Sequence, residues 1–257
     1  KVQMYGCGIG PVTRESHRHL AAQVLNRCVD VITLREPDSR EELRAMGVTE
    51  PEILLTADPA LTLRRAEDDQ TDSVLLRAGI PPHGRYLCFA LRQWKGFADK
   101  APLFGQGARY AYETYGLTPV FVAVEKHLDP AAARLAAQGL EIPHYFLDDA
   151  GGAGTIIGAL SRMQAVVSMR LHALIFAAGQ GIPLAGVVYD PKVSAFLRYT
   201  GQENFTDLRD LTAENLQAMI DRAMAQAGHP EAQAEAVERL QALEGGNVTV
   251  ARRLLGM

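Results

Sequence analysis

The chain has 257 residues, of which 47% are hydrophobic and 22% are charged, and its formal net charge is −4. This composition is typical of a globular protein with a substantial core, and the length corresponds to one or two domains. The net charge disfavours a nucleic-acid binder, whose phosphate contacts need a basic surface. The sequence has no apolar run of the roughly 20 residues that span a membrane, so no transmembrane segment is predicted. Three cysteines without metal-ligand spacing favour a reduced, cytoplasmic environment.

Strand-like and helix-like segments alternate in the first part of the chain. The patterns predict strands at residues 2–5, 30–34 and 53–56, and helices at residues 14–28 and 39–46. The first helix should bury a face that includes Leu20 and Val24, and Ser39 with Glu42 forms a capping-box pattern at the start of the second. Because Lys1 leads directly into a strand and three strands are few for such a sheet, we expect that residues precede Lys1 and that the first domain is incomplete.

The second part of the chain continues the alternation after a charged stretch at residues 64–73 and a Pro/Gly loop at residues 81–84, which predict a domain boundary. Strands are predicted at 86–91, 119–124, 144–147, 165–169 and 184–189, and helices at 97–115, 129–138, 153–162, 172–179 and 191–199. Thr212 caps a further helix that Gly228 and Pro230 end. Alternation of this kind predicts a parallel sheet covered by helices on both faces. The sequence thus predicts an α/β protein with domains at residues 1–80 and 85–257, the second Rossmann-like with a helical tail.

Candidate site residues follow from a rule of open α/β sheets, whose ligands bind beyond the carboxyl ends of the strands. The polar residues at strand-to-helix turns are Arg14, Arg35, Arg92, Arg170, His172, Asp190 and Lys192. Helix N-termini at such turns also offer free N–H groups and a positive dipole end. This concentration of cationic side chains predicts a site for a small, multiply charged anion.

Structural roles are open for several of these side chains. Arg35 is also able to form a solvated ion pair with Glu36 or Asp38, and Arg92 to be a buried structural arginine. His172 opens an apolar helix, where a structural histidine is the alternative, although the turn places it on the ligand face.

Three further features have a structural reading as well. Lys192 follows an Asp-Pro helix start and is able simply to decorate it, but a lysine in a first helical turn opposes the helix dipole, which favours an anionic partner. The segment Gly6–Gly10 lacks the G-x-G-x-x-G spacing of dinucleotide sites and favours a tight, closely packed turn. His127 and Asp129 fall on a predicted loop, and neither is assigned a functional role.

Five segments together match a known family. They are Gly6-Cys-Gly-Ile-Gly-Pro11, Ile32-Thr-Leu-Arg-Glu-Pro-Asp-Ser39, Thr56-Ala-Asp-Pro59, Ser168-Met-Arg-Leu-His-Ala-Leu-Ile-Phe-Ala-Ala178 and Val188-Tyr-Asp-Pro-Lys192. The sequence resembles the polysaccharide pyruvyl transferases, most closely the CsaB-type bacterial enzymes that pyruvylate cell-wall glycans. The chain departs from the family pattern in lacking its opening Gly-Asn-x-Gly-Asp segment and in placing Glu36-Pro37 before Asp38.

The resemblance implies a fold, an activity and a site. The fold is GT-B-like, with two Rossmann-like domains facing across a cleft. The activity is transfer of an enolpyruvyl group from phosphoenolpyruvate (PEP) to two hydroxyls of a glycan sugar, which makes a cyclic ketal and releases phosphate. No cofactor and no metal are implied, and the acceptor is a lipid-linked glycan met at the inner face of the membrane by a cytoplasmic enzyme. The implied PEP-binding residues are Arg14, Arg92, Arg170, Leu171, His172 and Lys192, of which His172 and Lys192 are the catalytic ones.

The chemistry of PEP agrees with the list of cations. Its carboxylate and phosphate suit arginine, which binds each group through two parallel hydrogen bonds. His172 is able to protonate the methylene carbon near neutral pH, and Lys192 to stabilise the departing phosphate. Two other functions stay open: a GT-B glycosyltransferase that uses a nucleotide sugar, for which no clear ribose-binding acid is found, and an inactive glycan-binding fragment.

Overall fold

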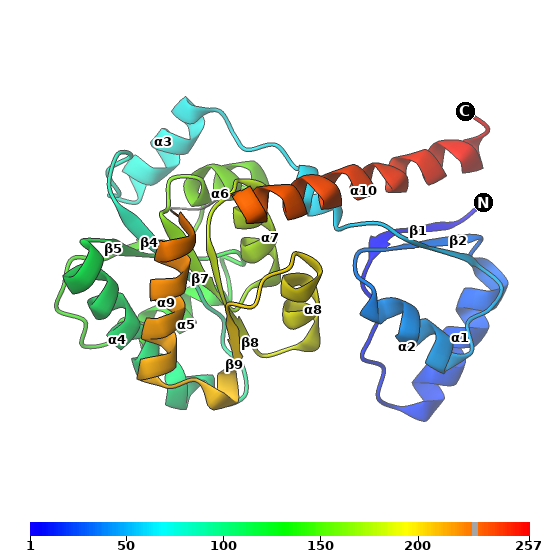
Figure 1. Ribbon diagram of the computed structural model, residues 1–257, viewed down its shortest axis with the longest axis horizontal. Helices are drawn as coiled ribbons and strands as arrows, with labels where there is room; N and C mark the ends of the chain where they lie inside the picture. The colour runs from blue at the N-terminus through cyan, green and yellow to red at the C-terminus, as the bar shows by residue number, and fades with distance from the viewer. Residues whose placement is uncertain (228–230) are drawn as a thin grey trace.

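The computed structural model describes residues 1–227 and 231–257. The protein consists of two bodies, each built on a parallel β-sheet, and a long C-terminal helix that runs across both (Figure 1). The α/β class predicted from the alternating elements is confirmed. No helix in the described ranges is long and apolar enough to cross a lipid bilayer.

The smaller body, called here the small-sheet unit, has three parallel strands in the order β1-β2-β3. Its elements are β1 (Gln3–Cys7), α1 (Glu15–Cys28), β2 (Val31–Leu34), α2 (Asp38–Met46) and β3 (Glu52–Leu55). The predicted buried face of α1 is wrong: Leu20 and Val24 are 59% and 48% exposed, whereas Ala22 is buried. Because α1 packs beside α2, the side of the helix that carries Ala22 reaches the core and the larger apolar residues do not. That the first domain is incomplete stays a prediction.

The larger body, the large-sheet unit, has six parallel strands in the order β6-β5-β4-β7-β8-β9. Its strands are β4 (Tyr86–Ala90), β5 (Thr118–Val122), β6 (Tyr145–Leu147), β7 (Ala165–Ser168), β8 (Leu184–Val188) and β9 (Phe205–Asp207). Its helices are α3 (Asp68–Arg77), α4 (Phe97–Tyr115), α5 (Asp129–Ala136), α6 (Ala153–Leu160), α7 (Leu171–Gly179), α8 (Pro191–Tyr199), the 3-10 turn η2 (Leu208–Asp210) and α9 (Ala213–Ala227). This strand order is that of the doubly wound Rossmann fold, whose direction of winding reverses between β4 and β7.

The sequence predicts a polar domain boundary at residues 64–73. In the structure, residues 68–73 instead form the first part of helix α3. The charges occupy its outer side, where Asp68 and Asp72 accept hydrogen bonds from Arg162, while Val74 and Leu75 are buried. Helix α3 packs against α6 of the large-sheet unit. The chain therefore joins this unit before residue 68, and the division at residues 80–85 stays a prediction.

The tail of the chain is helical, as predicted. Thr212 accepts a hydrogen bond from the Asn215 N–H (3.2 Å) at the start of α9, whereas the predicted helix end at Gly228 and Pro230 lies outside the described residues. Helix α10 (Glu231–Leu255) then passes from the large-sheet unit to the small-sheet unit (Figure 1). It packs on η1 (Pro59–Thr62), α7 and β1. Its buried Asn247 donates to the Ala57 carbonyl (3.0 Å), next to Thr56, whose carbonyl accepts from Tyr199 of α8 (2.9 Å). These two hydrogen bonds thus connect the segment after β3 to helices α10 and α8.

Candidate anion-binding site

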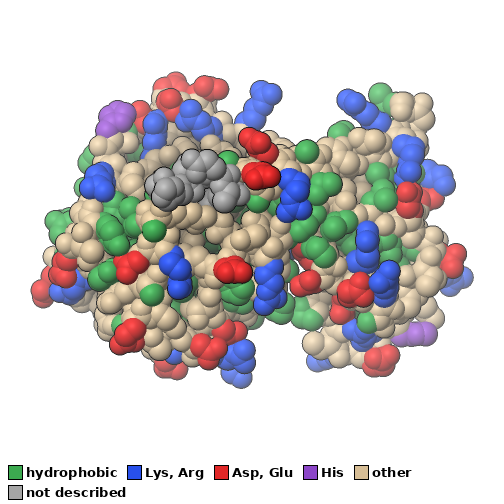
Figure 2. Space-filling view, viewed as in Figure 1, with side chains coloured by type: hydrophobic (Ala, Val, Ile, Leu, Met, Phe, Trp, Pro, Cys, Tyr) green, Lys and Arg blue, Asp and Glu red, His purple; other side chains and the backbone are tan. Residues whose placement is uncertain are grey.

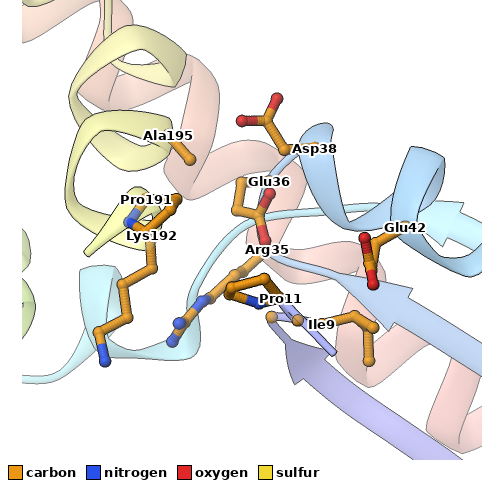
Figure 3. Close-up of a pocket in the computed structure, with 11 residues that line it drawn as sticks. Ile9, Pro11, Arg35, Glu36, Asp38, Glu42, Pro191, Lys192 and Ala195 are labelled. Carbon is orange, nitrogen blue, oxygen red and sulfur yellow. The ribbon is translucent and has the colours of Figure 1, made fainter. Parts of the chain in front are cut away.

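A pocket of about 160 Å³ lies between the two units. The space-filling view shows the surface notched between the two bodies, with Lys and Arg side chains near the notch (Figure 2). Residues Gly8–Pro11, Arg35, Glu36, Asp38 and Glu42 line the pocket from the small-sheet unit, and Pro191, Lys192 and Ala195 line it from α8. The close-up shows the ends of the Arg35 and Lys192 side chains directed to the same side of the pocket (Figure 3). Each unit therefore contributes a cation.

The turn from β7 to α7 carries Arg170 and His172 to the carboxyl end of the large sheet. Ser168, fully buried at the end of β7, accepts a hydrogen bond from the Arg170 N–H (2.9 Å). Its hydroxyl also lies 3.2 Å from the Ala90 carbonyl on β4. The turn is thereby fixed at the point where the sheet reverses its winding, which is where open α/β sheets bind ligands.

Asp129 holds Arg170, and sequence reasoning did not assign it a role. Its carboxylate is buried and accepts the N–H groups of Val124 (3.0 Å) and Glu125 (2.8 Å), and its Oδ2 lies 3.3 Å from Arg170 Nε. Burial raises the pKa of Asp129, and the two N–H groups and Arg170 oppose this rise. Its Oδ1 has no hydrogen-bond partner among the described residues. One edge of the Arg170 guanidinium is therefore engaged by a buried carboxylate.

Arg35 makes a different ion pair from those considered in the sequence. Its Nη1 lies 3.0 Å from Asp58 Oδ2, and Asp58 Oδ1 accepts the Ala60 N–H (3.0 Å) at the start of η1. Glu36 instead bonds Ser39, both to its backbone N–H (3.0 Å) and to its hydroxyl. Arg35 is therefore oriented by the buried Asp58, and Asp38 is not its partner.

The glycine loop before α1 is packed directly against Arg35. A Cβ atom at Gly8 would lie 2.7 Å from Arg35 Nε. The absence of a Cβ at Gly8 therefore permits the close approach of Arg35, as expected of a tight turn. The loop is held to α2, because the Ile9 N–H donates to the Ser39 hydroxyl (2.7 Å) and the Val12 N–H to Glu42 (3.3 Å). The capping box predicted for Ser39 and Glu42 is therefore wrong: α2 begins after Pro37, and both side chains bond the loop instead.

The next turn along the sheet, from β8 to α8, places Lys192 beside the cluster. The Asp190 carboxylate caps α8 by accepting the Lys192 N–H (3.1 Å) and lies 3.6 Å from Lys192 Nζ. Arg92, which follows β4, donates to the Tyr189 hydroxyl (2.9 Å), and its guanidinium lies 4.9 Å from the centre of that ring. Because β7 and β8 are adjacent parallel strands, Arg170, His172 and Lys192 lie on successive turns at one end of the sheet, as predicted.

The imidazole of His172 interacts electrostatically with charged side chains of both units. Loss of hydration lowers the pKa of the His172 imidazole, and the positive charge of Arg35 on the opposite unit lowers it further. Arg170 and Lys192 act in the same direction, whereas the negative charge of Asp58 raises it. The residue is nevertheless accessible from solvent, so the surrounding groups remove only part of the hydration of its ring. In the free protein the imidazole is therefore biased toward its neutral form, and an anion would reverse that bias.

Of the six expected PEP-binding residues, Lys192 is the one that lines the pocket. Arg92, Arg170 and His172 follow the neighbouring strands β4 and β7 at the same end of the large sheet, and the side chains of Arg14 and Leu171 are not brought to the pocket. Arg14 is exposed before the first turn of α1 and is not among the residues that line the pocket. Leu171 is buried in the core of the large-sheet unit, so only its backbone at the start of α7 is able to face a ligand. The role of Arg14 stays a prediction, and the cation that the small-sheet unit does supply is Arg35.

Two parallel-sheet units with a pocket between them to which each contributes a cation define a two-domain α/β protein of the GT-B type. The same fold occurs in HepE of Anabaena in complex with UDP and glucose (TM-score 0.63, 14% identity, 100% of this chain and 71% of that one). It also occurs in a glycosyltransferase from Rickettsia africae (0.58, 12%, 97% and 68%) and in UDP-GlcNAc 2-epimerase from Neisseria meningitidis (0.63, 11%, 100% and 70%). At such identities the likeness concerns the fold alone.

The sequence identifies the family. The model of the polysaccharide pyruvyl transferase family matches residues 1–191, and the chain belongs to that family. No protein of curated function matches the sequence significantly.

Proposed function

We propose that the protein transfers an enolpyruvyl group from PEP to two hydroxyls of one glycan sugar, forming a cyclic ketal and releasing phosphate. The observation that carries the proposal is a pocket with Arg35 on one wall and Lys192 on the other, next to the turn that carries Arg170 and His172, in a chain of this family. PEP is small and multiply anionic, and the pocket between the units is small and offers one cation from each unit, beside the carboxylates of Glu36, Asp38 and Glu42. The acceptor in this proposal is a lipid-linked glycan, met at the inner face of the membrane.

The first step is protonation of PEP. His172, as an imidazolium, gives its proton to the methylene carbon, and the double-bond electrons form the new C–H bond of a methyl group. The neighbouring carbon becomes electron-poor, and a sugar hydroxyl adds to it and loses its proton to the neutral imidazole. His172 thus ends this step reprotonated.

The second step expels phosphate. The bond between the central carbon and the phosphate oxygen breaks, and the electron pair leaves with phosphate. The second hydroxyl of the same sugar adds to that carbon and closes the ketal, and its proton leaves with the phosphate. Lys192 and Arg35, on opposite walls of the pocket, stabilise the negative charge of the leaving phosphate, and Arg170 and Arg92 hold the carboxylate.

The protonation state of His172 is set by substrate binding in this scheme. In the free protein the surrounding cations lower the pKa of His172. A bound carboxylate and phosphate introduce negative charge beside the same ring and favour the imidazolium. The acid is therefore loaded when PEP is present, which ties proton transfer to a filled donor site.

The test is glycan-dependent release of phosphate from PEP. We expect inorganic phosphate to appear only when both PEP and an acceptor glycan are present, together with a ketal methyl signal in the proton NMR spectrum. In deuterated water that methyl group should carry one solvent deuteron, which reports the protonation step. Transfer of a sugar from a UDP-sugar, with PEP left intact across the glycan panel, would refute the proposal and favour a glycosyltransferase.

A further inference from the structure

A second pocket, of about 600 Å³, opens on the same end of the large sheet beside the candidate anion site. Trp94, from the loop after β4, and Tyr189, at the end of β8, form one wall, and Asp190 and Asp207 lie on its lining. The rings of Trp94 and Tyr189 are 4.8 Å apart with an angle of 61° between their planes. Trp94 is 45% exposed, although it is a large hydrophobic side chain. An exposed aromatic wall in a concave pocket is the composition of a small-molecule site.

We infer that this pocket, called here the Trp94 pocket, binds the acceptor sugar of the proposed transfer. The inference rests on the proposed function. Sugar rings present apolar C–H faces that pack on exposed aromatic rings and hydroxyl edges that bond carboxylates and backbone groups. The Trp94 pocket offers both kinds of surface, because its lining includes the rings of Trp94 and Tyr189 and the acidic residues Asp190 and Asp207. Its volume also exceeds the 160 Å³ of the anion pocket, in keeping with a glycan as the larger substrate.

The two pockets are adjacent at the start of α8. Pro191 lines both of them, whereas Asp190 lines the Trp94 pocket and Lys192 lines the anion pocket. The guanidinium of Arg92, one of the proposed PEP-binding residues, lies 5.0 Å from the Trp94 ring and 4.9 Å from the Tyr189 ring. A sugar stacked on Trp94 would therefore lie next to residues that hold PEP in the proposed transfer.

The sequence holds a single tryptophan, Trp94, so the pocket has its own spectroscopic probe. Methyl glycosides of glucose, galactose, mannose and N-acetylhexosamines are titrated into the wild-type protein without PEP, and tryptophan fluorescence is recorded. We expect at least one glycoside to change the intensity or the emission maximum in a saturable manner. A silent tryptophan across the panel, in a protein that releases phosphate from PEP with one of these sugars, would overturn the inference and leave the proposed function intact.

Substitutions of Trp94 distinguish two roles of its ring, which are stacking on the sugar and packing against the Arg92 guanidinium. Trp94→Ala should raise the KM for the acceptor about tenfold, a factor that corresponds to about 1.4 kcal/mol of binding free energy. Trp94→Phe keeps an aromatic face and should stay within about threefold of the wild type. The KM for PEP should change less than the KM for the acceptor, because Arg92 keeps its hydrogen bond to Tyr189 (2.9 Å). An equal rise of both KM values in Trp94→Ala would assign Trp94 to Arg92 instead of the sugar.

A nucleotide is the rival occupant. If UDP changes the fluorescence of Trp94 and none of the glycosides does, the Trp94 pocket is a nucleobase site and the inference is wrong. If glycosides bind but PEP is never consumed, the proposed function fails while the sugar site stands. The two proposals are thus tested apart.

Discussion

Replacing Gly8 with alanine should disturb the anion site through Arg35. The added Cβ would lie 2.7 Å from Arg35 Nε, and ordinary contact begins at 3.4 Å, so the guanidinium must retreat by about 0.7 Å. A movement of this size, directed away from Asp58, would lengthen the 3.0 Å contact with that carboxylate to about 3.7 Å, beyond hydrogen-bond distance. A hydrogen bond between charged groups contributes about 1.5–3 kcal/mol, and because Arg35 keeps some contact with water we expect a loss at the lower end. The melting temperature should fall by roughly 2–4 °C for each kcal/mol lost.

The activity of the variant carries the sharper result. With Arg35 displaced, the KM for PEP should rise about tenfold, equivalent to about 1.4 kcal/mol, in an assay of phosphate release. Gly245→Ala is the matched control, because it lies inside α10 and its added Cβ would meet no atom of the described residues within 4 Å beyond its chain neighbours and the backbone of its own helix. That change should stabilise the protein by about 0.5–1 kcal/mol without altering the KM. An unchanged KM in Gly8→Ala would show that Arg35 does not contact the donor.

Three further outcomes are expected. His172→Asn should lower turnover roughly a hundredfold or more with a smaller effect on the KM for PEP; near-normal turnover of the folded variant would make His172 structural. Lost hydration and nearby cations lower the pKa of His172 in the free protein, so binding of PEP near pH 7 should take up protons and be tighter at lower pH. Calorimetry in buffers of different ionisation enthalpy measures this uptake. Equal proton uptake by the His172→Asn variant would place the proton on another group. Asp129→Ala removes the buried acceptor of two N–H groups and of Arg170 and should cost about 3–5 kcal/mol in urea denaturation, with Asp129→Asn costing less; a loss below about 1 kcal/mol would contradict this account of Arg170.

The features that could be predicted from sequence are those set by local pattern. The helix at residues 97–115 and the strands of the large sheet follow from apolar periodicity, and Arg170, His172 and Lys192 follow from the rule that adjacent parallel strands end together. The charged residues 64–73 suggest a loop, which hides helix α3. They occupy the solvent side of that helix, while Val74 and Leu75 are buried.

The remaining features depend on contacts between distant segments. Asp129 looks like an ordinary helix-start residue, and only the fold brings it to Arg170. Arg35 pairs with Asp58 because each follows the end of one of the adjacent parallel strands β2 and β3, Asp58 by way of the start of η1. The signal that could have found Asp58 is its place in Thr56–Pro59, one of the five segments that resemble the family.

The division of the pocket between two sheets has a consequence for its response to salt. Arg35 belongs to one wall and Lys192 to the other, and in the empty protein each is paired with a carboxylate of its own unit, Asp58 or Asp190. A bound anion of charge two or more adds an attraction from both cations toward a common centre. Dissolved ions screen that attraction over about 8–10 Å at moderate ionic strength. Added salt should therefore loosen the walls around a bound anion and act less on the empty pocket, so the size of the salt effect on the distance between the units reports whether the site is filled.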